Sequence, residues 1–176
     1  MTPELRTNLT SGPAPILDFD GTLARLDVDW PGLRRRLDVR SIEDLWINAN
    51  DRRWAEVTAA EVHAATVAHQ VRTLDSLLAG VKYFAVLSNN SEVAVATFLD
   101  RFPDMRRRAA AVVGRETLGG PKSSFEVFES GYAHCLHALG RPLRPMYVGD
   151  QAYELEFAAR LGAMAIDVAS LGATNA

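Results

Sequence analysis

The sequence predicts an α/β protein with a parallel sheet, whose core is interrupted after the first strand by a small helical insertion. Three observations lead to this prediction. A short apolar run at 15–17 ends abruptly in acidic residues and Gly21, as a buried strand does when its carboxyl end carries polar side chains. Residues 24–80 then have a mostly helical pattern. From Lys82 onward, strands and helices alternate, which favours parallel strands joined by crossovers on both faces of the sheet.

The alternation after Lys82 gives a definite set of expected elements. Strands are expected at 83–87, 109–113, 146–148 and 163–168, and helices at 91–102, 125–139 and 154–161. Within the insertion, Ser41 and Asp44 form a capping box, a pair that typically opens a helix. The alanine-rich stretch at 53–78 predicts one or two helices that end at Gly80 as the C-cap.

The composition is that of a globular protein without a general affinity for nucleic acid or membranes. Of its 176 residues 48% are hydrophobic, enough to bury a sizeable core, and the net charge is only −3. No apolar run reaches the roughly 18 residues of a membrane span, and the first residues lack the apolar core of a signal peptide. The single cysteine, Cys135, excludes an internal disulfide and is expected to pack in the core. We therefore expect a cytoplasmic protein.

Acidic side chains follow two of the expected strands. Asp18 and Asp20 come after the first strand, and Asp150 follows the strand at 146–148. Because ligands bind beyond the carboxyl ends of the strands in an open parallel sheet, we expect these carboxylates to share one site. Asp18 and Asp150 are candidate ligands for Mg²⁺, which prefers oxygen ligands that leave room for water and phosphate. Asp18 can also act as a covalent nucleophile, with Asp20 as the acid and base.

A hydroxyl, an amide and an ammonium complete an inventory suited to phosphoryl transfer. Ser88 and Asn89 follow the strand at 83–87, and Lys122 precedes the helix at 125–139. Ser88 and the amides at the start of the next helix can donate to phosphoryl oxygens, since helix N-termini favour anions. Lys122 is one of only two lysines in the chain and can neutralise charge on the transferred group. Taken alone, Ser88 can equally be a helix cap and Lys122 a solvated side chain.

The motifs resemble those of the haloacid dehalogenase-like (HAD) superfamily. Residues 18–23, Asp-Phe-Asp-Gly-Thr-Leu, look like its first signature. The other three signatures are similar and occur in the same order: Ser88 after an apolar strand, Lys122 before a helix, and Asp150 with the acid Glu154 four residues later. The resemblance spans nearly the whole chain. It implies a Rossmannoid, three-layer α/β/α core with a parallel sheet and a mobile α-helical cap after the first strand, which excludes water and selects the substrate.

The resemblance also implies a role for each matching residue. Asp18 is the expected nucleophile and a metal ligand. Asp20 is the expected general acid and base, with its backbone carbonyl on the metal. Ser88 and Lys122 are expected to bind the phosphoryl group, together with Asn89, and Lys122 to orient the nucleophile. Asp150 completes the Mg²⁺ site.

The sequence departs from the family pattern at three places. Glu154 stands where an aspartate is more usual, so we expect it to be a weak or water-mediated metal ligand. Gln151 replaces a common serine, and Ser123 and Ser124 follow the lysine in place of a frequent proline. None of these changes removes a reactive group. We expect these changes to affect the geometry of the metal site and the reaction rate more than the class of reaction.

The family layout gives domain bounds and an expected activity. We expect an N-terminal tail at 1–13, a catalytic core at 14–23 and 79–176, and a helical cap at 24–78. The expected protein is a Mg²⁺-dependent phosphomonoester hydrolase that acts on a small phosphorylated metabolite, as a monomer or homodimer. Dehalogenation is disfavoured because Asp20 is present, and phosphonate cleavage because the cap contains no lysine. A sugar phosphomutase of the same superfamily and a non-catalytic module that binds a phosphorylated ligand remain open.

The expected cap is rich in tryptophan and arginine. Its three tryptophans can line a pocket, but a small insertion also needs bulky residues for its own core, and this second role is favoured. They are Trp30, Trp46 and Trp54. Six of its arginines can either recruit an anionic substrate or form a solvated face. They are Arg34, Arg35, Arg36, Arg40, Arg52 and Arg53.

Overall fold

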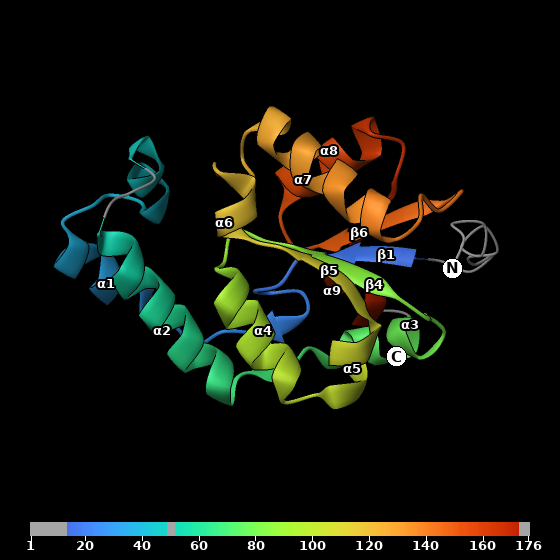
Figure 1. Ribbon diagram of the computed structural model, residues 1–176, viewed down its shortest axis with the longest axis horizontal. Coiled ribbons are helices and arrows are strands. Elements are labelled where there is room, and N and C mark those ends of the chain that lie inside the picture. The colour runs from blue at the N-terminus through green and yellow to red at the C-terminus, as the bar shows by residue number, and fades with distance from the viewer. Residues whose placement is uncertain (1–13, 49–51, 173–176) are drawn as a thin grey trace, which may run out of the picture.

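A central sheet of five parallel strands organises the protein (Figure 1). The computed structural model describes residues 14–48 and 52–172, so the expected tail at 1–13 lies outside the described residues. The strand order is β5-β4-β1-β6-β7. The strands are β1 (Ala14–Leu17), β4 (Phe84–Leu87), β5 (Ala109–Val113), β6 (Pro145–Gly149) and β7 (Met164–Asp167). The predicted α/β class and parallel sheet are confirmed.

Helices cover both faces of the sheet (Figure 1). One face carries α7 (Phe125–Ala138) and α8 (Ala152–Arg160). The other carries α3 (Asp75–Ala79), α4 (Glu92–Asp100) and α9 (Val168–Gly172). The core is therefore the three-layer α/β/α arrangement that the sequence predicts. Within the described ranges, no helix combines the length and the apolar character needed to cross a bilayer.

Neighbouring residues of a central strand pack on opposite faces of the sheet, because side chains alternate along a strand. Ile16 and Tyr147 belong to the apolar cluster under α7 and α8. Leu17 and Val148, the next residues in each strand, belong to the cluster on the α4 face. Every residue of β1 and β4 is buried. This burial on both faces explains why these strands appear in the sequence as continuous apolar runs.

The insertion between β1 and β4 is mostly helical, as expected. It contains α1 (Trp30–Leu37), the 3₁₀ helix η2 (Ile42–Ile47) and α2 (Arg53–Val67). The predicted capping box is present at the start of η2. There the Asp44 carboxylate accepts the backbone N–H of Ser41 at 2.9 Å.

The structure contains several short elements that the sequence did not predict. The helical stretch expected at 53–78 is divided into α2, the short helix η3 (Arg72–Leu74) and α3, which ends at Gly80. Two-residue strands, β2 (Ala24–Arg25) and β3 (His69–Gln70), pair antiparallel at the ends of the insertion. α5 (Pro103–Arg108) and α6 (Arg115–Leu118) flank β5. Elements of two to six residues are too short to show a hydrophobic period.

The insertion packs in two places. α1, η2 and the first half of α2 enclose a small cluster of their own, centred on Leu33 and Leu45. The second half of α2 packs instead in the main core, where Ala64 and Ala65 join Leu17. In Figure 1, α1 and η2 project from the core while α2 runs back to lie beside α4. The cap bounds 24–78 stay a prediction, and the packing favours a narrower cap built around the small cluster.

Cys135 lies in the core, as its helical pattern predicts. Its side chain is fully buried on α7, in the same cluster as Ile16. Burial raises the pKa of its thiol to about 12. A thiol with such a pKa stays protonated near neutral pH and is therefore a packing residue and not a nucleophile.

Phe98 of α4 provides a test of this packing. Its ring is fully buried, with its centroid 5.5 Å from that of Phe19 and 4.9 Å from that of Phe102. Phe98→Ala should lower the free energy of unfolding by about 3–5 kcal/mol, because it leaves a cavity in the main core. Val93→Ala on the same helix, where the side chain is 57% exposed, should change it by less than about 0.5 kcal/mol. Urea denaturation measures both variants, and equal losses would contradict the packing.

Candidate active site

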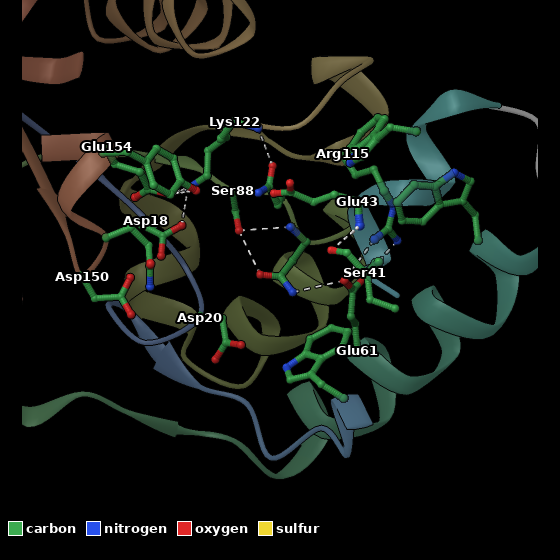
Figure 2. Close-up of a pocket in the computed structure, with 18 of the residues that line it drawn as sticks. Asp18, Asp20, Ser41, Glu43, Glu61, Ser88, Arg115, Lys122, Asp150 and Glu154 are labelled. Atoms are coloured by element: carbon green, nitrogen blue, oxygen red, sulfur yellow. Dashed lines mark hydrogen bonds and ion pairs between the residues drawn. The ribbon is translucent and has the colours of Figure 1, made fainter. Parts of the chain in front are cut away.

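A cleft of about 510 Å³ lies between the carboxyl edge of the sheet and the insertion (Figure 2). All of the candidate site residues predicted from the sequence line it. They are Asp18, Asp20, Ser88, Asn89, Lys122, Asp150 and Glu154. Four separate segments of the chain thus bring their polar side chains to one place. The insertion supplies the facing wall, which includes Trp30 and Arg34.

A buried ion pair joins Asp18 and Lys122. Asp18 directly follows β1, and its backbone N–H donates to the carbonyl of Val148 at 2.9 Å, which continues the pairing with β6. Lys122 Nζ donates to Asp18 Oδ1 at 2.5 Å. The two side chains are only 7% and 2% exposed. Burial raises the pKa of Asp18 to about 7, and the attraction of the Lys122 charge opposes the rise.

The Lys122 ammonium is hydrogen-bonded on every side. Besides Asp18, it donates to Glu154 Oε1 at 2.7 Å and to the carbonyl of Leu87 at 3.1 Å. Burial disfavours the charged form, but the attraction of the two carboxylates outweighs it and raises the pKa of Lys122 above its ordinary value. Lys122 is therefore a fixed positive charge whose three N–H groups point at protein acceptors.

Glu154 makes hydrogen bonds with both of its carboxylate oxygens. Oε1 accepts from Lys122 and, at 3.2 Å, from the hydroxyl of Tyr153. Oε2 accepts from the hydroxyl of Tyr147 at 2.7 Å. One of its oxygens also lies within 4.8 Å of oxygens of Asp18 and Asp150, so the three acids can together surround a metal ion. The hydrogen bonds favour a role for Glu154 in holding Lys122, and its metal contact stays a prediction.

Asp18 and Asp150 fit a hard divalent cation better than Glu154 does. Asp150 is exposed, and no hydrogen bond or ion pair of its carboxylate is found within the described residues. Gly21 makes its position possible: a Cβ at Gly21 would lie 2.4 Å from Asp150 Oδ2, and the φ of +87° also favours glycine. Carboxylate oxygens are the ligands that Mg²⁺ prefers. The residues present therefore suit the predicted ion.

Asp20 is oriented by the turn that follows β1. Its Oδ1 accepts the backbone N–H of Leu26 at 2.9 Å, and the side chain is half-buried. Burial raises the pKa of the Asp20 carboxyl, while the hydrogen bond from Leu26 opposes the rise. A raised pKa makes it easier for this carboxyl group to hold a proton and give it up again.

Ser88 and Asn89 are both fixed by neighbouring side chains. The Ser88 hydroxyl donates to Asn90 Oδ1 at 2.9 Å and accepts the backbone N–H of Asn90 at 3.2 Å. Asn89 Oδ1 accepts the backbone N–H of Lys122 at 2.8 Å, which holds the Lys122 loop against the end of β4. The Asn89 side chain thus holds the loop in place, and the phosphate contact expected for Asn89 stays a prediction.

A second buried ion pair lies in the cleft, and it was not predicted from the sequence. Glu61 on α2 and Arg115 on α6 form a two-pronged contact, with Nη1–Oε1 and Nη2–Oε2 distances of 3.0 Å. Their side chains are 2% and 5% exposed. Neither belongs to a recognised motif, and 54 residues separate them. The one available signal is that Arg115 follows β5 after a glycine, at a strand end like the other site residues.

Only one of the six cap arginines singled out above lines the cleft. It is Arg34, which is half-buried and whose guanidinium has no hydrogen-bond or ion-pair partner in the part of the chain that the structure describes. Arg53 instead donates to the carbonyl of Leu37 at 3.0 Å within the cap. Trp30 and Trp54 line the cleft and also pack against the small cap cluster, so they serve in both of the roles weighed from the sequence.

Comparisons with known proteins identify the fold. No family model matches the chain, and no curated protein does. Among solved structures, a HAD-superfamily hydrolase from Ehrlichia chaffeensis matches with 16% identity and a TM-score of 0.55, over 90% of this chain and 88% of that one. A mutant of CbbY from Rhodobacter sphaeroides, in complex with xylulose-1,5-bisphosphate, matches with 18% identity and a TM-score of 0.59, over 88% and 84%.

A dehalogenase also matches, with 18% identity and a TM-score of 0.53, over 89% of this chain and 84% of that one. At such identities the likeness concerns the fold. The chain has the fold of HAD-superfamily hydrolases, as the resemblance of its motifs implies. Because dehalogenases and proteins that bind sugar phosphates share this fold, the choice of reaction depends on the residues in the cleft.

The charge balance around Lys122 predicts different stabilities for two variants. Lys122→Met leaves Asp18 and Glu154 buried without a cation, so the free energy of unfolding should fall by about 3–5 kcal/mol near pH 8. The deficit should shrink toward about pH 5, because burial raises the pKa of Asp18 and its carboxyl group then takes up a proton in the folded state. Asp18→Asn keeps the Lys122–Glu154 pair and should be far less destabilised. Urea denaturation at both pH values measures this, and equal losses would contradict the charge balance.

Proposed function

We propose that the chain is a Mg²⁺-dependent phosphomonoester hydrolase that acts through a phosphoaspartate at Asp18 on a small phosphorylated metabolite. The observation that carries the proposal is the Asp18 carboxylate. It is buried at the end of β1, bonded to Lys122 at 2.5 Å, and close to Asp150 and Asp20. A carboxylate placed beside a fixed positive charge and a second acid suits nucleophilic attack on phosphorus.

In the first step, an oxygen of Asp18 attacks the phosphorus atom and the ester P–O bond breaks. The electron pair of that bond leaves with the alcohol oxygen, which takes a proton from the Asp20 carboxyl. The raised pKa of Asp20 supports this role, since burial keeps a larger share of the carboxyl protonated near neutral pH. In the second step, a water attacks the phosphorus of the phosphoaspartate while Asp20 takes its proton. Phosphate leaves and Asp18 is restored.

The phosphoryl group is held by hydrogen bonds and by charge. Ser88 and the backbone N–H of Asn89 lie where the chain enters α4, a helix N-terminus that favours anions. Lys122 directs its three N–H groups at Asp18, Glu154 and Leu87. It therefore orients the nucleophile and contributes charge, and a direct bond to the phosphoryl group would require it to release one of these acceptors.

A bound Mg²⁺ would be held by the carboxylates of Asp18 and Asp150 and the backbone carbonyl of Asp20. When bound, it supplies positive charge that stabilises the phosphoryl oxygens during transfer. The cluster of carboxylates and the opening that Gly21 leaves for Asp150 support this assignment. Glu154 is the weaker candidate ligand because both of its oxygens accept hydrogen bonds.

The presence of Asp20 favours phosphate-ester hydrolysis over dehalogenation, although both reactions occur on the same fold. A departing halide needs no proton, whereas the alkoxide released from a phosphate ester does. Asp20 lies in the cleft with one oxygen fixed by the N–H of Leu26. An oriented acid at this position favours ester hydrolysis.

Turnover of p-nitrophenyl phosphate and a panel of phosphorylated metabolites tests the proposal. The parent should release inorganic phosphate with Mg²⁺ and lose this activity in excess EDTA. Asp18→Asn should reduce kcat by at least about 10⁴-fold, because it removes the nucleophile and keeps the fold. An active Asp18→Asn would refute the assignment. A parent that binds phosphate without turnover would indicate the ligand-binding module, and isomerisation without phosphate release a phosphomutase.

Of the six cap arginines, Arg34 is the one placed to recruit an anionic substrate, because it lines the cleft. If its unpaired guanidinium contacts an anionic group of the substrate, Arg34→Gln should raise KM for the best substrate of the panel about 10-fold or more, with little change in kcat. Arg35→Gln, an exposed neighbour outside the cleft, is the matched control and should leave both constants unchanged. An unchanged KM in Arg34→Gln would rule out this recruitment.

A further inference from the structure

The insertion forms an aromatic wall along the cleft. All three tryptophans of the chain line the cleft, and each belongs to a different helix of the insertion: Trp30 to α1, Trp46 to η2 and Trp54 to α2. Each of the three side chains is only partly buried. The wall therefore offers flat, apolar surface to the part of a substrate that extends beyond the phosphoryl group.

Trp46 is the tryptophan that packing within the insertion explains least. The small cap cluster is centred on the buried Leu33 and Leu45, and Trp30 and Trp54 pack against it. Among the described residues, Trp46 packs against none of the three buried clusters. Its ring contacts that of Trp54 edge to face, at a centroid distance of 5.0 Å. A ligand that covers the remaining surface of Trp46 would be stabilised, because apolar area leaves water.

The ring of Trp54 is fixed from the core side. The Arg115 guanidinium lies 4.4 Å from its centroid, and Nη2 of the same arginine donates to Thr58 Oγ1 at 2.7 Å. Glu61 binds the guanidinium through both carboxylate oxygens at 3.0 Å. Because Trp54 is held in this way and contacts Trp46, it supports Trp46 in one orientation. A ring that is already ordered loses less conformational entropy when a ligand binds.

The alcohol part of a phosphate ester would extend toward this wall. In an in-line displacement the attacking and departing oxygens lie on opposite sides of phosphorus, so an ester attacked by Asp18 directs its alcohol away from Asp18. Figure 2 shows Asp18 on one side of Ser88 and Glu43 of the insertion on the other. Glu43 belongs to η2, the helix that also carries Trp46.

Charge does not set the preference of this side of the cleft. Arg34 and Glu43 line it with one charge of each sign, and Glu61 and Arg115 neutralise each other as a buried pair. What the wall offers is therefore ring surface. The cleft volume of about 510 Å³ is in the range of pockets that bind small organic molecules, so a ring has room beside the phosphoryl group.

We propose that the chain prefers phosphate esters whose alcohol carries an aromatic or heteroaromatic ring, and that Trp46 determines this preference by packing against that ring. The inference rests on the proposed function and narrows its small phosphorylated metabolite to a class. A favourable aromatic pair adds roughly 2- to 10-fold in affinity beyond the area that it buries. A saturated ring of the same size buries a similar area and lacks this contribution.

Two esters of matched size separate aromatic packing from simple burial. Benzyl phosphate and cyclohexylmethyl phosphate both release a primary alcohol, and they differ in whether the ring is aromatic. The measurement is the ratio of their kcat/KM values with Mg²⁺, which should favour benzyl phosphate about 3- to 10-fold in the parent. Because one protein sample hydrolyses both esters, a partial loss of folded protein cancels in the ratio.

Three variants test whether Trp46 sets this ratio. Trp46→Leu should lower it about 3-fold or more, because leucine has no aromatic ring, whereas Trp46→Phe should keep it within about twofold of the parent. Ile47→Ala is the control on the same helix, since its side chain is 92% exposed and does not line the cleft, and it should leave the ratio unchanged. A parent without the preference would overturn the proposal. So would a Trp46→Leu ratio equal to that of the parent, or equal ratios for Trp46→Leu and Trp46→Phe.

Binding measured by calorimetry separates this inference from the proposed function. In 2-phenylethylphosphonate and 2-cyclohexylethylphosphonate a CH₂ group replaces the ester oxygen, so neither compound can be hydrolysed as an ester. The parent should bind the phenyl compound about 3- to 10-fold more tightly, and Trp46→Leu should lose this preference. If the parent hydrolyses esters without regard to the ring, the proposed function stands and the inference fails. If it hydrolyses none but keeps the binding preference, the ring site stands and the hydrolase proposal fails.

Discussion

The buried ammonium of Lys122, bonded to Asp18 and Glu154, is the interaction on which the rest of the site depends. Two carboxylates in a medium of low polarity repel each other and lose hydration, so they can remain ionised together only around a positive charge. Lys122 supplies that charge from the loop before α7, and its contact with the carbonyl of Leu87 ties it to the end of β4. The same contacts orient Asp18, the proposed nucleophile, and bind the Glu154 carboxylate to the ammonium.

The sheet explains why residues 104 positions apart meet in one ion pair. Parallel strands end on one edge, and β1 lies at the centre with β4 and β6 on either side. The apolar strands and the polar residues that follow them are visible in the sequence, so the α/β class and the location of Asp18, Ser88 and Asp150 at one edge could be predicted. The six-residue first motif then linked them to a known fold.

Other parts of the site could not be predicted, for physical reasons. Glu61 and Arg115 are buried charges whose partner lies on a distant element, and neither hydrophobic period nor local spacing indicates such a pair. The position of Tyr147 in the apolar strand β6 indicates a core residue, yet its hydroxyl donates a hydrogen bond to Glu154 Oε2 at 2.7 Å. The packing of the insertion was even harder to predict from the sequence. Its small residues let the second half of α2 pack in the main core, a choice set by tertiary contacts that the helical pattern alone does not contain.

The central claim is that Asp18 carries the phosphoryl group during turnover, and trapping that intermediate tests it most directly. The protein would be acid-quenched while it hydrolyses p-nitrophenyl phosphate with Mg²⁺, and its peptides analysed by mass spectrometry. The account predicts one added phosphoryl group on Asp18, and none in the Asp18→Asn variant or without substrate. A phosphoryl group on another residue such as Ser88, or steady phosphate release by Asp18→Asn, would contradict it.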